Sequence, residues 1–138
     1  MRERTLDPQK LDQLQSNLES GIKLLQSANP GWNRSDPAET IELLQEGIRA
    51  GTVFMLEAAA LLADCLAKAT DWKLVSLEGK SFTGLALVSP DGAYAIYPEL
   101  VAAKAARNPE EGSLKAHFDT IKCGSLPPSE PGTYTQLG

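Results

Sequence analysis

The chain has 138 residues, of which 42% are hydrophobic and 22% are charged, and its formal net charge is −5 at pH 7. This length and composition are typical of one globular domain with its own hydrophobic core, and they exclude a wholly disordered chain. Lys and Arg are scattered among acidic residues, so the sequence lacks the basic stripe that nucleic-acid-binding domains present. We therefore expect neither a nucleic acid nor a membrane surface as the partner.

The start of the chain carries no visible targeting signal. Residues 1–8 read MRERTLDP, which has neither the apolar stretch nor the cleavage site of a secretory signal. The longest apolar run, near residues 53–66, is interrupted by Glu57 and Asp64 and falls short of the roughly 20 residues of a membrane span. If the chain is complete, these features favour the cytoplasm.

Two amphipathic helices are predicted in the first third of the chain. Asp7 before a proline is a typical helix start, and Leu and Ile then recur at spacings of three and four as far as Leu25. Asp36 before a second proline starts the next helix, which we expect to end near Gly51. Thr52 is then expected to cap the helix that follows.

A central helix and a small sheet are predicted next. Residues 53–69 carry charge only at Glu57, Asp64 and Lys68, and so thin a polar stripe indicates a helix covered by other elements or by a second subunit. Strand-like segments follow at residues 71–77, 82–88 and 94–96. The connections between them are too short for parallel crossovers, so we expect a three-stranded antiparallel sheet.

Two short helices and a tail complete the chain. Pro98 opens a helix that runs to residue 107, and a last helix spans about residues 113–122. Residues 124–138 are rich in Ser, Pro and Gly and read as a tail. We predict one α+β domain over residues 1–123, in which N-terminal helices pack on a small three-stranded antiparallel sheet that is followed by two short helices.

No catalytic or metal-binding pattern is visible in the sequence. His117 is the only histidine and has no potential ligands at metal-binding spacing around it. Glu57 and Asp64 are seven residues apart on one helical face, which is more typical of a solvent-facing stripe than of an acid–base pair. Cys65 and Cys123 are isolated and are expected to be free thiols. We therefore predict no enzyme activity, no metal site and no cofactor.

Aromatic residues provide the candidate contact surface. Trp32 and Arg34 lie in the loop between the first two helices, and Trp and Arg are typical anchors of protein interfaces. Tyr94 and Tyr97 bracket the third predicted strand, and their spacing of three places them on opposite faces, so that one is expected to be exposed. These four residues are the predicted partner-binding residues. The alternative for Trp32 is that it folds back to cap the first helix pair.

One block of the chain resembles a known family. An apolar helix, a strand headed by Trp72, a further strand pair and a helix opened by Pro98 follow one another within residues 53–106. This order resembles a family of small bacterial α+β domains of unknown function. The resemblance is carried by Leu61, Leu62, Ala63, Leu66, Trp72, Lys73, Leu74, Val75, Ala86, Leu87, Val88, Tyr97, Pro98 and Val101. It departs from the family at residues 77–80, where an acidic segment is usual, and it implies a fold but no activity.

Taken together, these features predict a non-enzymatic protein-binding domain of a bacterial cytoplasm, of accessory, adaptor or immunity type, whose partner is another protein. Two alternatives stay open. One is a small-ligand-binding domain or small enzyme with a pocket between sheet and helices, for which Glu57, Asp64 or His117 would be the polar groups. The other is a structural homodimer sealed by the helix at residues 53–69 or by the first helix.

Overall fold

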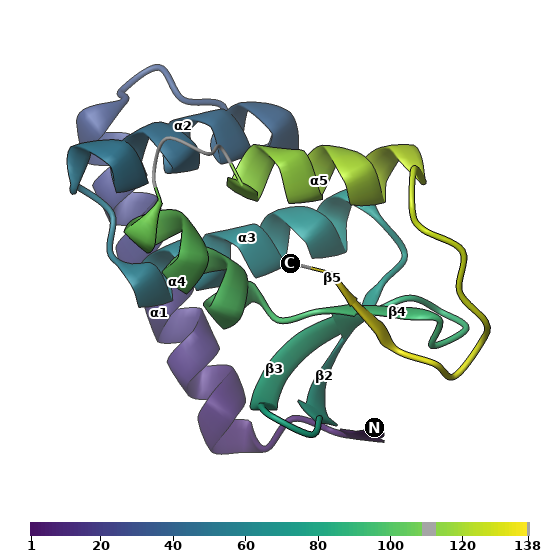
Figure 1. The fold of residues 1–138 in the computed structure, drawn as a ribbon. Coiled ribbons are helices and arrows are strands. Elements are labelled where there is room, and N and C mark those ends of the chain that lie inside the picture. The colour runs from purple at the N-terminus through teal and green to yellow at the C-terminus, as the bar shows by residue number, and fades with distance from the viewer. Residues whose placement is uncertain (109–112, 138) are drawn as a thin grey trace.

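The computed structural model describes residues 1–108 and 113–137, and its elements are arranged as a helical layer beside a small sheet (Figure 1). The helices are α1 (Pro8–Ala28), α2 (Pro37–Ala50), α3 (Met55–Ala69), α4 (Pro98–Arg107) and α5 (Ser113–Cys123). The strands are β1 (Arg2–Arg4), β2 (Lys73–Glu78), β3 (Thr83–Val88), β4 (Tyr94–Ile96) and β5 (Thr135–Leu137). Within the described ranges, no helix is both long enough and apolar enough to cross a membrane.

The sheet corrects the predicted fold. It has five strands in the order β1-β2-β3-β4-β5, in which β1 to β4 are antiparallel neighbours and β5 pairs with β4 in parallel. The prediction of a three-stranded antiparallel sheet is therefore wrong, although the molecule is still α+β. The two strands that the sequence did not predict, β1 and β5, have only three residues each, which is too few to show an alternating pattern. Each joins an edge of the sheet through backbone pairing.

Helix α3 is the centre of the helical layer. Nearly all of its residues from Ala58 to Leu66 are buried, and it packs against each of the other four helices (Figure 1). The remaining polar stripe includes an ion pair of 2.8 Å between Lys68 Nζ and Asp64 Oδ2. The prediction of a covered central helix is thus confirmed, and its cover comes from the chain's own elements.

Both faces of the sheet carry apolar residues. Leu74 and Leu87 pair across β2 and β3, and they join the main core under the helices. On the other face, Leu77 and Val88 belong to a second, smaller core around Tyr97. Strand β3 is apolar from Leu85 to Val88 because successive side chains contact a core on each face, whereas β2 keeps polar residues at Lys73, Ser76 and Glu78.

The edges of the sheet are linked by side chains. Tyr134 Oη, just before β5, donates a hydrogen bond to Glu3 on β1, and Lys73 Nζ lies 2.9 Å from the other carboxylate oxygen of Glu3. The hydrogen bond from Tyr134 and the ammonium of Lys73 lower the pKa of Glu3, and the same hydrogen bond raises the pKa of Tyr134. Residues 124–137 thus run back along the sheet and end beside β4.

The junction between α2 and α3 differs from its prediction in one respect. Helix α2 ends at Ala50, and Gly51 takes the left-handed conformation with a φ of 74°, so the predicted break is confirmed. Thr52, however, donates its backbone N–H to the carbonyl of Gly47 and so takes part in capping the C-terminus of α2. The residue at the N-cap of α3 is Phe54, and its side chain makes no capping hydrogen bond. The predicted cap by Thr52 is therefore wrong.

Candidate functional site

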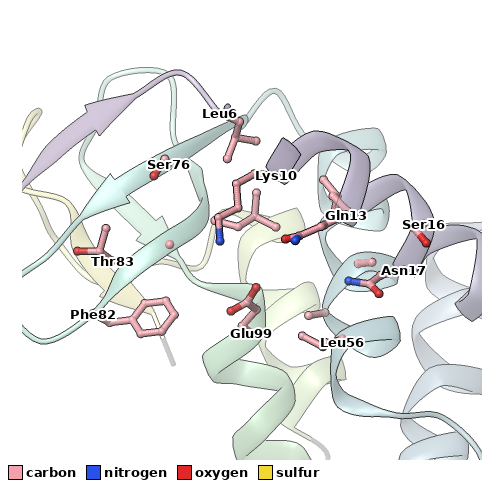
Figure 2. A pocket seen from close by; sticks show the side chains of 15 residues that line it. Leu6, Lys10, Gln13, Ser16, Asn17, Leu56, Ser76, Phe82, Thr83 and Glu99 are labelled. Carbon is pink, nitrogen blue, oxygen red and sulfur yellow. The ribbon is translucent and has the colours of Figure 1, made fainter. Parts of the chain in front are cut away.

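A groove of about 520 Å³ opens between the first half of α1, the starts of α3 and α4, and the strands β2 and β3 (Figure 2). It is lined by Leu6, Lys10, Gln13, Leu14, Ser16, Asn17, Leu56, Ala59, Ala60, Ser76, Phe82, Thr83, Gly84, Leu85 and Glu99. Apolar and polar side chains contribute together, which is the composition of a binding surface more than of a core.

The groove exists because α1 packs closely on the core only in its second half. Gly21 and Leu25, the buried residues of α1, both lie there. At Gly21 a Cβ atom would lie 2.8 Å from Leu61 Cδ1, so the two helices touch where the side chain is missing. In the first half of α1, Leu14 is half-buried and Leu11 exposes 44% of its surface. The predicted apolar stripe is therefore only partly used by the chain's own core.

Opposite charges face each other across the groove. Lys10 comes from α1 and Glu99 from the first turn of α4, and Figure 2 shows both side chains pointing into the space between these elements. Among the described residues, neither charge has an ion-pair partner within 4.0 Å. The amides of Gln13 and Asn17 line the α1 wall beside Lys10. A ligand in the groove would thus meet one positive and one negative group on opposite walls.

An exposed apolar surface adjoins the groove. Phe54, Met55 and Leu56 expose 64%, 42% and 46% of their surface, and Leu56 also lines the groove. We call these three residues the Phe54 surface. Exposed apolar residues beside a groove with a polar rim are a feature of interaction sites.

The predicted anchor Trp32 is not at the surface. Its side chain is 7% exposed, and Nε1 donates a hydrogen bond of 2.9 Å to Thr40 Oγ1 on α2. Trp32 therefore folds back onto the helix pair, which was its alternative interpretation. Arg34, two residues later, is exposed. A Trp32→Ala variant would consequently measure the loss of core packing together with any loss of binding.

Tyr94 lies on β4 and Tyr97 follows this strand as the N-cap of α4, and β4 is distant from the α1–α2 loop that carries Trp32 and Arg34 (Figure 1). Tyr97 is 1% exposed, and its hydroxyl donates a hydrogen bond of 3.2 Å to the Leu77 carbonyl. Tyr94 is half-buried, and its ring stacks on that of Trp72. The structure therefore does not bring the four predicted partner-binding residues together into one surface.

The groups considered for chemistry are not among the residues that line the groove. Glu57, Asp64 and His117 are absent from its lining, although the groove itself occupies the place between sheet and helices where a pocket was considered. No group of three or more His, Cys, Asp or Glu that could hold a metal ion occurs within residues 1–108 and 113–137. Cys123 is exposed, whereas Cys65 is buried and its burial raises the pKa of the thiol to about 12.

The residues that form the groove and the Phe54 surface were missed by the sequence analysis. The groove joins segments about 90 residues apart, for example Lys10 and Glu99, and no local pattern marks such a meeting. Phe54 had a usable signal, because a bulky apolar residue at a helix start contradicts the preference for Ser, Thr, Asp or Asn there. With Thr52 predicted as the cap, Phe54 would stand inside the helix, where an apolar residue is ordinary.

Comparison of the chain with protein-family models, with curated proteins and with solved structures gave no match. The roles of the residues above therefore follow from their geometry and chemistry alone.

Proposed function

We propose that this chain is a non-enzymatic protein-binding domain of accessory, adaptor or immunity type, which binds its partner through the groove and the Phe54 surface. The observation that carries the proposal is the placement of an exposed Phe at the N-cap of α3. We further propose the cytoplasm as its location, because Cys65 and Cys123 are both free thiols, as is usual in a reducing compartment.

The N-cap of α3 is costly to the fold. Asp7 and Asp36 cap α1 and α2 by accepting hydrogen bonds from backbone amides of their first turns. The side chain of Phe54 accepts none, so α3 forgoes a stabilisation of typically about 1 kcal/mol. Tyr97 at the start of α4 is also not a capping residue, but its ring is part of the second core. Phe54 has no comparable structural role. An N-cap residue that neither caps the helix nor packs in a core is expected where the residue serves a function instead of stability.

The chemistry of the groove supports binding in preference to catalysis. Its charged groups, Lys10 and Glu99, stand on opposite walls, and the other polar lining residues are amides and hydroxyls. Such groups fix the orientation of a bound chain by hydrogen bonds and ion pairs at the rim of an apolar contact. The apolar residues extend beyond the groove onto the Phe54 surface, where a partner as large as a protein would cover them.

The test is a chemical crosslinking and capture experiment with two variants of equal charge. Phe54→Asp places a carboxylate on the proposed surface, whereas Ala116→Asp places one on the exposed face of α5. We expect the wild-type chain and Ala116→Asp to capture the same protein, and Phe54→Asp to lose it. Equal capture by all three would contradict the proposed surface.

A second candidate is a small-ligand-binding domain. The volume of about 520 Å³ lies within the range of about 300–1,000 Å³ that is usual for ligand pockets, and Lys10, Gln13 and Asn17 point polar atoms toward it. A thermal-shift screen with metabolites tests this candidate. A specific stabiliser whose effect disappears in Lys10→Gln and in Glu99→Gln would favour the ligand over the protein partner.

A further inference from the structure

We propose that the groove binds a short extended segment of a partner protein, which brings an acid to Lys10, a base to Glu99 and an apolar side chain to the bottom of the groove. This inference rests on the proposed function, since it gives the chemistry of the segment that the partner places in the groove. Three features carry it: an open continuation of the core, a row of amides on α1 and two charges of opposite sign.

The bottom of the groove continues the main core. Leu74 and Leu87 form a cross-strand pair on the face of the β2–β3 hairpin that packs under the helices. The next pair on the same face, Ser76 and Leu85, is half-buried and lines the groove. Helix α3, which packs against both α1 and α4, adds two alanine side chains to the lining. An apolar side chain of a partner would therefore extend an existing core at this place.

Side-chain amides along α1 match the repeat of an extended peptide. Gln13 and Asn17 line the same wall and are four residues apart, which is about 6 Å along a helix (Figure 2). On one edge of an extended chain, the backbone N–H and C=O groups recur every two residues, or about 6.6 Å. A carboxamide both donates and accepts hydrogen bonds, so each amide can pair with such an edge. Neither amide makes a hydrogen bond to another side chain or backbone group in the described ranges.

The length of this wall sets the length of the segment. From Lys10 to Asn17, α1 rises by about 10 Å, which corresponds to about three residues of extended chain. Side chains of an extended chain alternate between two faces, so residues that point to the bottom of the groove alternate with residues at its rim. Backbone hydrogen bonds supply affinity in this binding mode, and the alternate side chains supply specificity.

The two charges of the groove select the polar residues of the segment. Lys10 stands on the α1 wall and Glu99 on the α4 wall, and in the described part of the chain neither has an ion-pair partner within 4.0 Å. A segment with an acid toward α1 and a base toward α4 pairs with both, whereas a segment of one sign leaves one wall without a partner. Such complementarity favours the matching segment and fixes its orientation.

The first experiment selects binders from a random peptide library displayed on phage, with the full chain as the immobilised target. We expect the wild type to enrich peptides with one acid and one base at positions that alternate with apolar residues. Lys10→Glu should lose the selection for the acid, and Glu99→Lys the selection for the base. Lys23→Glu is the matched control, because Lys23 is exposed on the second half of α1 and does not line the groove. No enrichment, or the same enrichment in all variants, would overturn the inference.

A double variant tests the orientation of the segment. Lys10→Glu combined with Glu99→Lys exchanges the charges of the two walls and keeps the formal net charge at −5, because the two changes cancel. We expect it to enrich the same apolar residues with the acid and the base in exchanged positions. A general effect of net charge would not produce this exchange. A double variant that selects the wild-type order would overturn the placement of the segment between the two walls.

The second experiment measures the affinity of enriched peptides by fluorescence polarisation. Gln13→Ala combined with Asn17→Ala removes the hydrogen bonds to the peptide backbone, so we expect at least about a tenfold loss of affinity for every enriched peptide. Gln15→Ala is the control, because this amide is exposed on α1 outside the groove. Circular dichroism and cooperative unfolding show that each variant is folded. Unchanged affinity without both groove amides would overturn the extended backbone along α1.

The outcomes separate this inference from the proposed function. Capture of a protein that depends on Phe54, but is equal in Lys10→Glu and in the variant without Gln13 and Asn17 amides, would overturn this inference and leave the protein-binding role in place. Enrichment of the expected peptides together with equal capture by Phe54→Asp would support this inference and overturn the Phe54 surface. A metabolite that stabilises the chain through Lys10 and Glu99, with no peptide enriched, would overturn it in favour of the small ligand.

Discussion

At the level of single residues, the first turn of α3 lacks the capping side chain that α1 and α2 have. Asp36 accepts hydrogen bonds from the backbone amides of Ala38 and Glu39, with N–O distances of 3.1 and 3.2 Å. At the equivalent place in α3, Phe54 leaves the amides of the first turn without a side-chain partner. Because Phe54 is 64% exposed, its ring contributes little burial to offset this loss.

We predict that Phe54→Ser stabilises the isolated chain while it weakens binding. Ser at an N-cap should raise the free energy of unfolding by about 1 kcal/mol and the melting temperature by roughly 3–6 °C. Thermal unfolding followed by circular dichroism at submicromolar concentration measures this change without a contribution from self-association. Asp36→Ala is the matched control, because it removes an existing cap and should lower the melting temperature by a similar amount. A lower melting temperature for Phe54→Ser would show that the ring supports the fold.

At the level of elements, the short edge strands depend on a few side-chain contacts. Tyr134 has a φ of 51°, an unusual conformation for a residue other than Gly, and its ring lies against Gly92. From this position its hydroxyl reaches Glu3 on β1, so that one hydrogen bond links the segment before β5 with the opposite edge of the sheet. Both β1 and β5 should therefore lose stability when this bond is removed.

We predict that Tyr134→Phe lowers stability most strongly near neutral pH. The hydrogen bond lowers the pKa of Glu3 from 4.5, so its contribution is present above pH 4.5 and is lost as pH falls through the folded value. It raises the pKa of Tyr134 from 10.0, so that contribution is present below pH 10 and is lost as pH rises through the folded value. The site is partly exposed, so we expect a loss of about 0.5–1.5 kcal/mol at pH 7.

Urea unfolding of wild type and variant at pH 3, 5, 7 and 10.5 measures this difference. It should be largest at pH 5 and 7 and smaller at both extremes, and Lys73 beside Glu3 should preserve part of the acid sensitivity. Tyr94→Phe is the control, since its hydroxyl donates to the neutral carbonyl of Pro127 and its loss should not depend on pH between 3 and 7. A difference for Tyr134→Phe that is constant with pH would contradict the assignment.

The elements that the sequence predicted well are those whose signals are local. The starts of α1 and α2 follow from Asp7 and Asp36 beside prolines, and the central β-hairpin follows from alternation in β2 and β3. The edge strands were missed because Arg2–Arg4 pairs with β2 more than 70 residues away, and three residues show no period. The groove was missed for the same reason, since its walls come from distant segments and its charges make no local pattern.

At the level of the whole molecule, one core holds the helical layer together. It includes residues from α2, α3, α4 and α5, from the sheet and from the loop that carries Trp32. Cys65 on α3 is 3% exposed within this core, and burial raises the pKa of its thiol to about 12. Cys123 at the end of α5 is exposed. Because the thiolate is the reactive form, the two cysteines should report on different events.

We predict that Cys123 reacts rapidly with a disulfide reagent at pH 8 in the native protein, while Cys65 reacts only when the molecule unfolds. A core shared by so many elements should open as one unit, so the labelling of Cys65 should increase with urea at the midpoint of global unfolding. Cys65→Ser should keep only the fast reaction and Cys123→Ser only the slow one. If Cys65 were labelled well below that midpoint, α3 would open locally, and the rigid wall that it provides to the groove and the Phe54 surface would not exist.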